Sequence, residues 1–272
     1  MAERVGVVAA LWRYPVKSMR GETLEVARIG PRGIAGDRGL ALVDDTTGHV
    51  ASAKHPRRWG GLLAARAETT REGVTLVLPD GTRLPAGAPG TDAALSAWCG
   101  RPVRLLDTPP HEATLERVAS DVESGRGQVA VRRLAAAAPD GTFFDYAPLH
   151  LVTTASLAAA APGEAPPVDP RRTRANLVVS TARSRGFVED AWSGRPLRVG
   201  EVVLRVGLPS PRCAVPGLAQ GDALSADAGV LPAIAAAHRI PVADLGSYAC
   251  LGIYADIEQA GVVRTGDPVV LV

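Results

Sequence analysis

The stretch Val5-Gly6-Val7-Val8-Ala9-Ala10-Leu11 is an apolar run near the start of the chain, and the turn Tyr14-Pro15-Val16-Lys17-Ser18 follows it. A short run rich in β-branched residues and ended by proline predicts a buried strand. Nine further segments share this pattern: residues 23–29, 39–44, 74–79, 103–106, 176–180, 197–199, 201–206, 251–256 and 268–272. So many short strands predict a mainly β fold, built as barrels or sandwiches.

Helical patterns are few and short. Three segments predict helices: residues 91–99, 154–161 and 226–238. The prolines of Pro109-Pro110 and the glycines of Gly125-Arg126-Gly127 interrupt the pattern of strands. We therefore expect two β-rich, barrel-like domains with a few short helices, the first over residues 1–107 and the second over residues 125–272.

The composition is that of an ordinary globular protein, with 46% hydrophobic and 21% charged residues. The net charge of +2 argues against nucleic acid as a partner, because such surfaces carry a larger basic excess. No run of about 18 apolar residues is present, so we expect no membrane-spanning helix. Of the 30 basic residues, only Lys17 and Lys54 are lysines.

The three cysteines are Cys99, Cys213 and Cys250, and their spacing indicates neither a zinc site nor a disulfide framework. We therefore expect a reducing, cytoplasmic location. Cys213 follows Arg212 in a loop stiffened by two prolines. A neighbouring guanidinium favours the thiolate form, which binds soft metals and attacks electrophiles. The alternative, a small buried hydrophobic residue, suits Cys99 and Cys250.

Three other segments carry candidate anion-binding cations. Lys17 and Ser18 place an ammonium beside a hydroxyl, which suits a phosphate. Arg38, after Gly36-Asp37, could grip a phosphate or carboxylate with its planar fork. Arg174 lies just before a predicted core strand and could point inward. The alternatives are a solvated lysine, a local ion pair between Asp37 and Arg38, and a solvated charged face.

Six segments, in this order along the chain, resemble the MOSC-domain family: Tyr14-Pro15-Val16-Lys17-Ser18, Gly36-Asp37-Arg38, Arg174-Ala175-Asn176-Leu177-Val178-Val179, Pro211-Arg212-Cys213, Gly252-Ile253-Tyr254 and Gly266-Asp267-Pro268-Val269. The resemblance covers nearly the whole chain. It is closest to the subgroup with an N-terminal MOSC β-barrel domain, which includes the mitochondrial amidoxime-reducing component and its bacterial relatives.

This resemblance implies a molybdopterin-type molybdenum cofactor at the interface of two β-rich domains. It implies that Cys213 is the metal ligand and the catalytic residue. The cofactor-binding residues expected from it, together with Arg212, are Lys17, Ser18, Arg38, Asp145, Arg174, Asn176 and Tyr254.

The resemblance also implies an activity: an oxidoreductase that reduces small N-hydroxylated or N-oxide substrates. No iron–sulfur domain follows the last strand, so electrons are expected from a separate ferredoxin- or cytochrome b5-like protein. Two alternatives stay open, a cofactor carrier or sulfur-transfer module and a metal-free metabolite-binding β-barrel. The chain has Ala175 where the family often has proline, and Ala214-Val215-Pro216 where reductases often show threonines. We therefore expect its substrate-facing surface to differ.

Overall fold

The computed structural model describes residues 2–118, 127–134, 138–181 and 184–272, and it is mainly β with a few short helices, as predicted. The strands are β1 Glu3–Arg13, β2 Glu22–Leu24, β3 Val26–Gly30, β4 Gly33–Ile34, β5 Ala41–Asp44, β6 Arg66–Thr70, β7 Gly73–Val77, β8 Arg83–Pro85, β9 Val103–Leu106, β10 Thr114–Val118, β11 Val129–Arg133, β12 Leu149–Thr153, β13 Leu177–Ser180, β14 Pro196–Val199, β15 Val202–Pro211, β16 Arg239–Pro241, β17 Ser247–Gln259, β18 Gly261–Arg264 and β19 Pro268–Leu271. The α-helices are α1 Pro56–Trp59, α2 Thr91–Cys99, α3 Thr154–Ala159, α4 Pro170–Thr173 and α5 Val230–Ala237.

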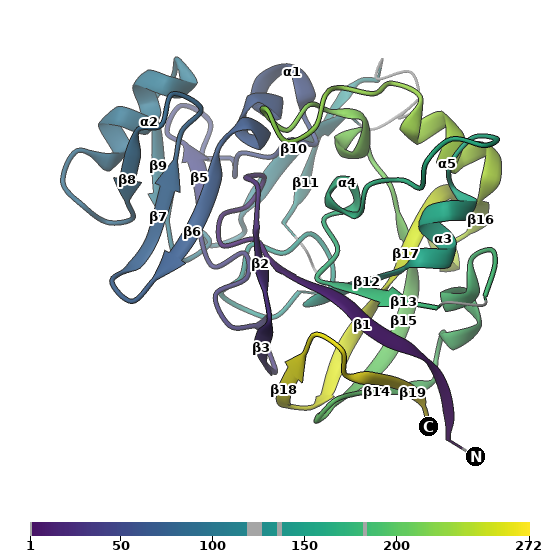
Figure 1. The fold of residues 1–272 in the computed structure, drawn as a ribbon. Coiled ribbons are helices and arrows are strands. Elements are labelled where there is room, and N and C mark those ends of the chain that lie inside the picture. The colour runs from purple at the N-terminus through teal and green to yellow at the C-terminus, as the bar shows by residue number, and fades with distance from the viewer. Residues whose placement is uncertain (1, 119–126, 135–137, 182–183) are drawn as a thin grey trace.

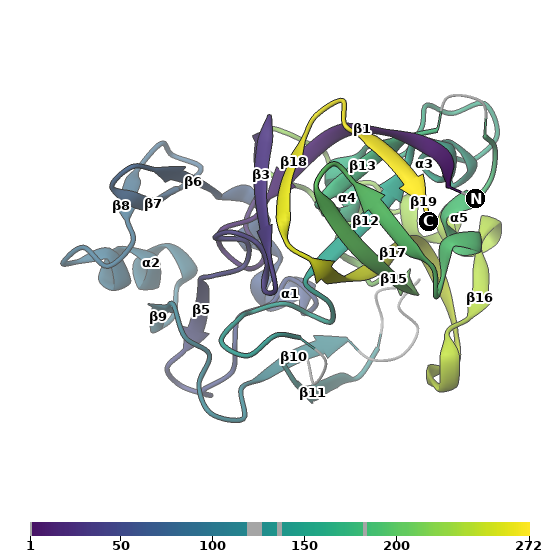
Figure 2. The same cartoon turned by 90° about the horizontal axis from the view of Figure 1, so that it is seen from below.

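A seven-stranded barrel forms the larger part of the molecule (Figures 1 and 2). Its strands follow the order β12-β13-β1-β19-β14-β15-β17, and pairing of β17 with β12 closes it. The inward-facing side chains of these strands make a continuous apolar core that includes Leu11, Leu151, Leu177 and Leu204. Closure leaves no free edge among these seven strands, and it fixes the strand ends from which site residues extend.

A smaller β-rich region lies to one side of the barrel, at the left of Figure 1. It contains the pair β5–β9, the three-stranded sheet β6-β7-β8 and helix α2. A second apolar core, with Leu42, Leu76 and Leu95 fully buried, holds it together. The first strand of the chain, β1, pairs with β13 and β19 in the barrel, so the chain enters this region only after β1. The domain limits 1–107 and 125–272 stay a prediction.

Every predicted strand segment contains a strand, and the three predicted helices are present. Helix α2 has the predicted limits because Gly100 adopts a left-handed conformation that ends it. Helix α3 begins with a capping box between Thr153 and Ser156. Helix α5 begins at Val230, four residues later than predicted, so Pro232 falls in its first turn, where proline removes no hydrogen bond.

The segment after β1 is tied to two distant parts of the chain. Lys17 N donates to Leu40 O and Arg38 N donates to Tyr14 O, each over 2.8 Å. Trp12 N donates to Asn176 O, also over 2.8 Å. These backbone bonds hold three of the polar segments side by side between the barrel and the smaller region. Within the described residues, no helix is long and apolar enough to cross a membrane.

Candidate functional site

One cavity collects every side chain that the sequence predicted for the site. It contains about 710 Å³ of open space, a volume that includes the solvent at its mouth. The predicted residues in its wall are Lys17, Ser18, Arg38, Asp145, Arg174, Asn176, Arg212, Cys213 and Tyr254. They come from segments up to 237 positions apart, so the fold alone brings them together.

Asp37 organises one side of this cavity from behind. Its buried carboxylate accepts hydrogen bonds from Tyr14 N over 2.7 Å and from Asn176 Nδ2 over 2.9 Å, and it pairs with Arg38. Asn176 Oδ1 in turn accepts from Arg38 Nη1 over 3.3 Å. Arg38 therefore pairs with Asp37 and also points into the cavity, so both of the arrangements considered for it are present. Asp37 fixes the guanidinium that lines the cavity.

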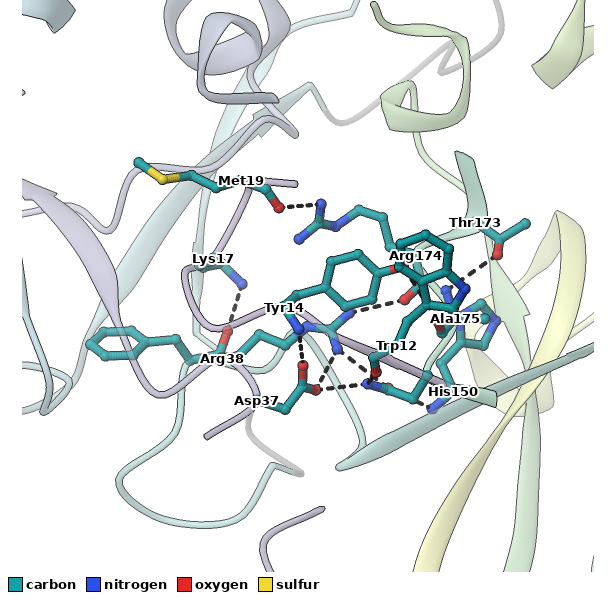
Figure 3. A network of polar contacts seen from close by, with 12 residues as sticks. Trp12, Tyr14, Lys17, Met19, Asp37, Arg38, His150, Thr173, Arg174 and Ala175 are labelled. Atoms are coloured by element: carbon teal, nitrogen blue, oxygen red, sulfur yellow. Dashed lines mark hydrogen bonds and ion pairs between the residues drawn. The ribbon is translucent and has the colours of Figure 1, made fainter. Parts of the chain in front are cut away.

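The ring of Tyr14 lies between two guanidinium groups, as Figure 3 shows. The carbon at the centre of each guanidinium is 4.5 Å from the ring centroid for Arg38 and 4.4 Å for Arg174. Burial, followed by the charge of Arg38, lowers the pKa of Arg174 to about 10. Burial also raises the pKa of Tyr14 to about 12, so the ring stays neutral and only its π face meets the cations.

The chain's two lysines meet at Asp145. Lys17 Nζ lies 2.7 Å and Lys54 Nζ 3.1 Å from the same oxygen, Asp145 Oδ1. Burial lowers the pKa of Lys17 to about 8, against the opposing effect of Asp145. Burial also acts to lower the pKa of Lys54, but the negative charges of Asp145 and Cys213 outweigh it and raise that pKa. The two ammonium groups hold the pKa of Asp145 well below its usual range although burial opposes them.

Cys213 lies just beyond the end of β15 and is half-buried. Arg212 beside it donates from Nη2 to Thr173 O over 2.7 Å and from Nη1 to Ser210 Oγ over 3.0 Å. Its Nε is buried and has no hydrogen-bond partner among the described residues. Arg212 is thus held in place by its two terminal nitrogens.

The backbone is strained at three of these positions. Ser18, Arg38 and Arg174 have φ values of 64°, 46° and 56°, and only two other non-glycine residues in the described part of the chain have positive φ. Such conformations persist where the surroundings enforce them, and they gather at functional sites. Ser18 Oγ accepts a hydrogen bond from Ala53 N over 3.0 Å, which helps to hold its turn in place.

The cavity wall also contains residues that the sequence did not indicate. Among the polar and aromatic ones are Lys54, Tyr146, His150 and Thr173. His150 Nε2 lies 3.2 Å from Leu251 O. Burial and the charge of Arg212 lower the pKa of His150 well below its usual value, so the ring is neutral and donates from Nε2 to that carbonyl. Tyr146 and His150 both pack against the ring of Tyr254, with centroids 5.0 and 5.5 Å away.

The charges in this wall do not balance. The cations are Lys17, Lys54, Arg38, Arg174 and Arg212, and the carboxylates that pair with them are Asp37 and Asp145. Within the described residues, no group of three His, Cys, Asp or Glu side chains is placed to hold a metal ion by itself. The wall therefore suits an anionic ligand, with one thiol available as a soft donor.

Two domain models match the chain in sequence. The model described as the MOSC domain matches residues 139–270, and the model described as the MOSC N-terminal beta barrel domain matches residues 5–96. The chain belongs to the MOSC-domain family. The cavity of this MOSC-domain protein draws on both matched regions, since Lys17 and Arg38 lie in one and Arg174 and Cys213 in the other.

Curated relatives match this MOSC-domain protein over nearly its full length. Mitochondrial amidoxime-reducing component 1 of Homo sapiens is 24% identical over 317 residues, which cover 100% of this chain and 84% of that protein. Mitochondrial amidoxime reducing component 2 of Macaca fascicularis is 24% identical over 299 residues, covering 98% and 84%. Among solved structures, the YuaD protein of Bacillus subtilis aligns with a TM-score of 0.43 and 15% identity, covering 100% of this chain and 96% of that one.

Proposed function

We propose that this protein is a molybdenum-cofactor-binding oxidoreductase that reduces N-hydroxylated or N-oxide substrates with electrons from a separate electron-transfer protein. The observation that carries the proposal is a single thiol, Cys213, in the wall of a cavity with a surplus of buried and half-buried cations. A cofactor that combines a phosphate with a soft metal centre needs both features.

The side chains present fit such a group. Arg212 Nε is a buried donor without a partner among the described residues, so its N–H can still donate to an anionic or carbonyl oxygen. Lys17, Arg38 and Arg174 bring charge that Asp37 and Asp145 only partly neutralise. Strained backbone at Ser18, Arg38 and Arg174 indicates that the wall is built for a ligand rather than for stability.

In the proposed roles, Cys213 ligates the metal, and Lys17, Ser18, Arg38, Arg174, Asn176 and Arg212 surround the phosphate and pterin. When bound, the cofactor supplies the two-electron chemistry that removes the substrate's oxygen. The two lysines of the chain would hold positive charge and protons around the cofactor. Lys54 keeps the proton of its ammonium at Nζ because its pKa is raised, so it stays positively charged in the same cavity as Cys213. Lys17, with a pKa near 8, can hold or release its Nζ proton close to neutrality.

The rest of the proposal concerns partners and setting. The overall reaction consumes two electrons and two protons per substrate and releases water, so a reduced donor must reach the protein in each cycle. We propose a ferredoxin- or cytochrome b5-like protein in that role. A cytoplasmic location accords with the free cysteines Cys99, Cys213 and Cys250.

The test is elemental analysis of protein purified from a host that makes the cofactor, wild type beside Cys213→Ala. Close to one molybdenum per chain in the wild type, and its fall in the variant with an unchanged circular dichroism spectrum, are expected. Reduction of benzamidoxime with a redox partner then tests turnover. Bound molybdenum without turnover would favour a carrier, and extra sulfur on Cys213 after incubation with a cysteine desulfurase would favour sulfur transfer. No molybdenum in the wild type would favour a metal-free binding protein.

A further inference from the structure

A second cavity adjoins the first one at Cys213. Six residues line both: Lys54, Asp145, Tyr146, Arg212, Cys213 and Tyr254. The second cavity has about 960 Å³ of open space, against about 710 Å³ in the first, both volumes including the solvent at the mouth. A ligand in the second cavity therefore reaches the thiol of Cys213 without entering the cluster of cations around Arg38 and Arg174.

The walls that belong only to the second cavity are largely apolar. They are formed by Leu208, Pro209, Pro211, Val242, Leu245 and Tyr248, together with Arg117. Leu245 is 56% exposed, one of few large hydrophobic residues this exposed in the described part of the chain. A single exposed leucine is unremarkable on a convex surface, but one that faces a concavity among other apolar residues indicates a binding surface. These walls suit the apolar body of a ligand.

Part of the apolar wall is held in place by its own hydrogen bonds. Val242, Leu245 and Tyr248 lie at the tip of the hairpin formed by β16 and β17. Val242 N donates to Gly246 O over 2.9 Å, and Leu245 N donates to Val242 O over 3.0 Å. The hydroxyl of Tyr248 donates to Leu245 O over 2.9 Å and pins the tip from the side. Because the tip is already ordered, binding against it requires little loss of conformational entropy.

The second cavity is also positively charged. Lys54, Arg117 and Arg212 line it, and the carboxylate in its wall, Asp145, is already bound by Lys17 and Lys54. Arg117 extends from β10, and this strand is held in place. Val118 N donates to Lys54 O over 3.0 Å, and Leu115 forms a β-bridge with Val50. Arg117 thus extends from a strand whose backbone is held in place, and it lines the cavity together with the apolar wall.

We propose that the second cavity binds amphipathic anions, with a ring-sized apolar body against Leu245 and Tyr248 and a carboxylate at Arg117. The inference rests on the proposed function for one point, that the end of the substrate facing Cys213 is the N-hydroxylated group. The substrates expected are therefore N-hydroxylated compounds that carry an aromatic or aliphatic ring and a carboxylate. Arg117 is the residue that distinguishes them from neutral analogues.

The first experiment measures binding without turnover, by isothermal titration of the full-length protein as purified. The probes are benzamide and 4-carbamoylbenzoate, which differ by one carboxylate. The wild type is expected to bind the carboxylate about tenfold more tightly, the usual effect of one charged hydrogen bond. Arg117→Gln should abolish this preference and Arg117→Lys should keep most of it. Arg132→Gln, on the paired strand β11 and outside the cavity, is the matched control and should keep all of it. Leu245→Ser should weaken the binding of both probes by a similar factor.

Equal binding of the two probes by the wild type, or a preference that survives in Arg117→Gln, would overturn the inference. The second experiment compares KM for benzamidoxime and 4-carboxybenzamidoxime with the molybdenum-loaded protein and a redox partner. A lower KM for the carboxylated oxime, lost in Arg117→Gln and kept in Arg132→Gln, is expected. If neither oxime is reduced while the titrations hold, the proposed function fails and the ligand preference stands. If both are reduced with equal KM, the function stands and the inference fails.

Discussion

Lys17 and Lys54, the only lysines among 30 basic residues, lie within 2.7 and 3.1 Å of the same oxygen of Asp145. The two ammonium groups come from different segments, one after β1 and the other just before α1. A chain that otherwise uses arginine places its compact, strongly hydrated ammonium groups together in the candidate site. Two planar guanidinium groups would fit less readily around one carboxylate oxygen than two compact ammonium groups do.

Replacing Lys17 by methionine is expected to stabilise the cofactor-free protein at pH 7. Burial lowers the pKa of Lys17 from 10.5 to about 8. At pH 7 the charged ammonium of Lys17 is therefore less stable in the folded protein than in the unfolded chain, and this lowers the free energy of unfolding. The side chain is 4% exposed, and its lowered pKa corresponds to a cost of about 3 kcal/mol for burying the charge at pH 7. Loss of the 2.8 Å hydrogen bond from Lys17 Nζ to Phe143 O offsets about 1 kcal/mol of this gain. Asp145 keeps Lys54 as its partner in this variant.

The pH dependence provides the check. Between about pH 8 and pH 10.5 the unfolded chain holds the Lys17 proton and the folded chain does not, so the Lys17 contribution to stability rises with pH. The advantage of Lys17→Met in urea unfolding should therefore shrink across that window. A variant that is less stable than the wild type at pH 7, or an advantage independent of pH up to 10.5, would contradict the pKa assigned to Lys17.

Removing the charge of Lys54 is expected to slow alkylation of Cys213. The charges of Lys54 and Cys213 are coupled, so Lys54→Met should lower the rate of alkylation of Cys213 by iodoacetamide at pH 7. Lys54→Arg should keep most of the rate. Cys99 and Cys250 are internal controls, because burial raises their pKa values to about 11 and about 12 and keeps them unreactive. Mass spectrometry of each cysteine peptide gives the three rates, and equal rates for Cys213 in all variants would refute the coupling.

Glu189, a buried residue outside the cavity, is expected to make the stability of the protein depend on pH in a second way. It is 1% exposed and accepts hydrogen bonds from Ser156 Oγ over 2.5 Å and Thr153 Oγ1 over 2.8 Å. Burial raises its pKa above the ordinary value of 4.5 despite these bonds. The folded protein then binds the Glu189 proton more tightly than the unfolded chain, so this contribution to stability is complete below pH 4.5 and is lost as pH rises through the raised pKa.

Glu189→Gln removes the titrating group and keeps one oxygen that can accept from a hydroxyl, while its Nε2 can donate to the other hydroxyl. Urea unfolding from pH 4 to pH 7 should show a stability difference between wild type and variant that moves in favour of the variant as pH rises. Parallel profiles across this range would show that Glu189 does not titrate differently in the folded and unfolded chains.

Most of the fold could be predicted from local sequence, because apolar runs such as residues 5–11 and 201–206 form strands in any mainly β protein. Strands β10 and β11 were missed for a physical reason. Thr114-Leu115-Glu116-Arg117-Val118 is half polar, and its pairing with β11 and the bridge of Leu115 to Val50 make it a strand. Such pairing is a tertiary effect that no local pattern carries.

The candidate site could be predicted where residues belong to recognisable segments, as Lys17, Arg38 and Cys213 do. Lys54 follows Ala53 and precedes His55-Pro56, and no pattern there indicates chemistry. Its one signal is composition, since a second lysine is rare in this chain. His150 lies within the buried strand β12, where an isolated histidine looks like any core residue until Leu251 and Arg212 are placed beside it.

Arg174 is expected to contribute to cofactor retention, and Arg171, three residues earlier, is its matched control. Arg174 lines the cavity and packs on Tyr14, whereas Arg171 pairs with Asp169 and lies outside the cavity. Arg174→Met removes one of the surplus cations and the 2.7 Å hydrogen bond to Met19 O, so molybdenum per chain should fall several-fold while stability falls by about 1 kcal/mol. Arg171→Met should keep its molybdenum. The measurement is metal content beside urea unfolding, and loss of metal in both variants, or in neither, would show that local charge at Arg174 does not govern retention.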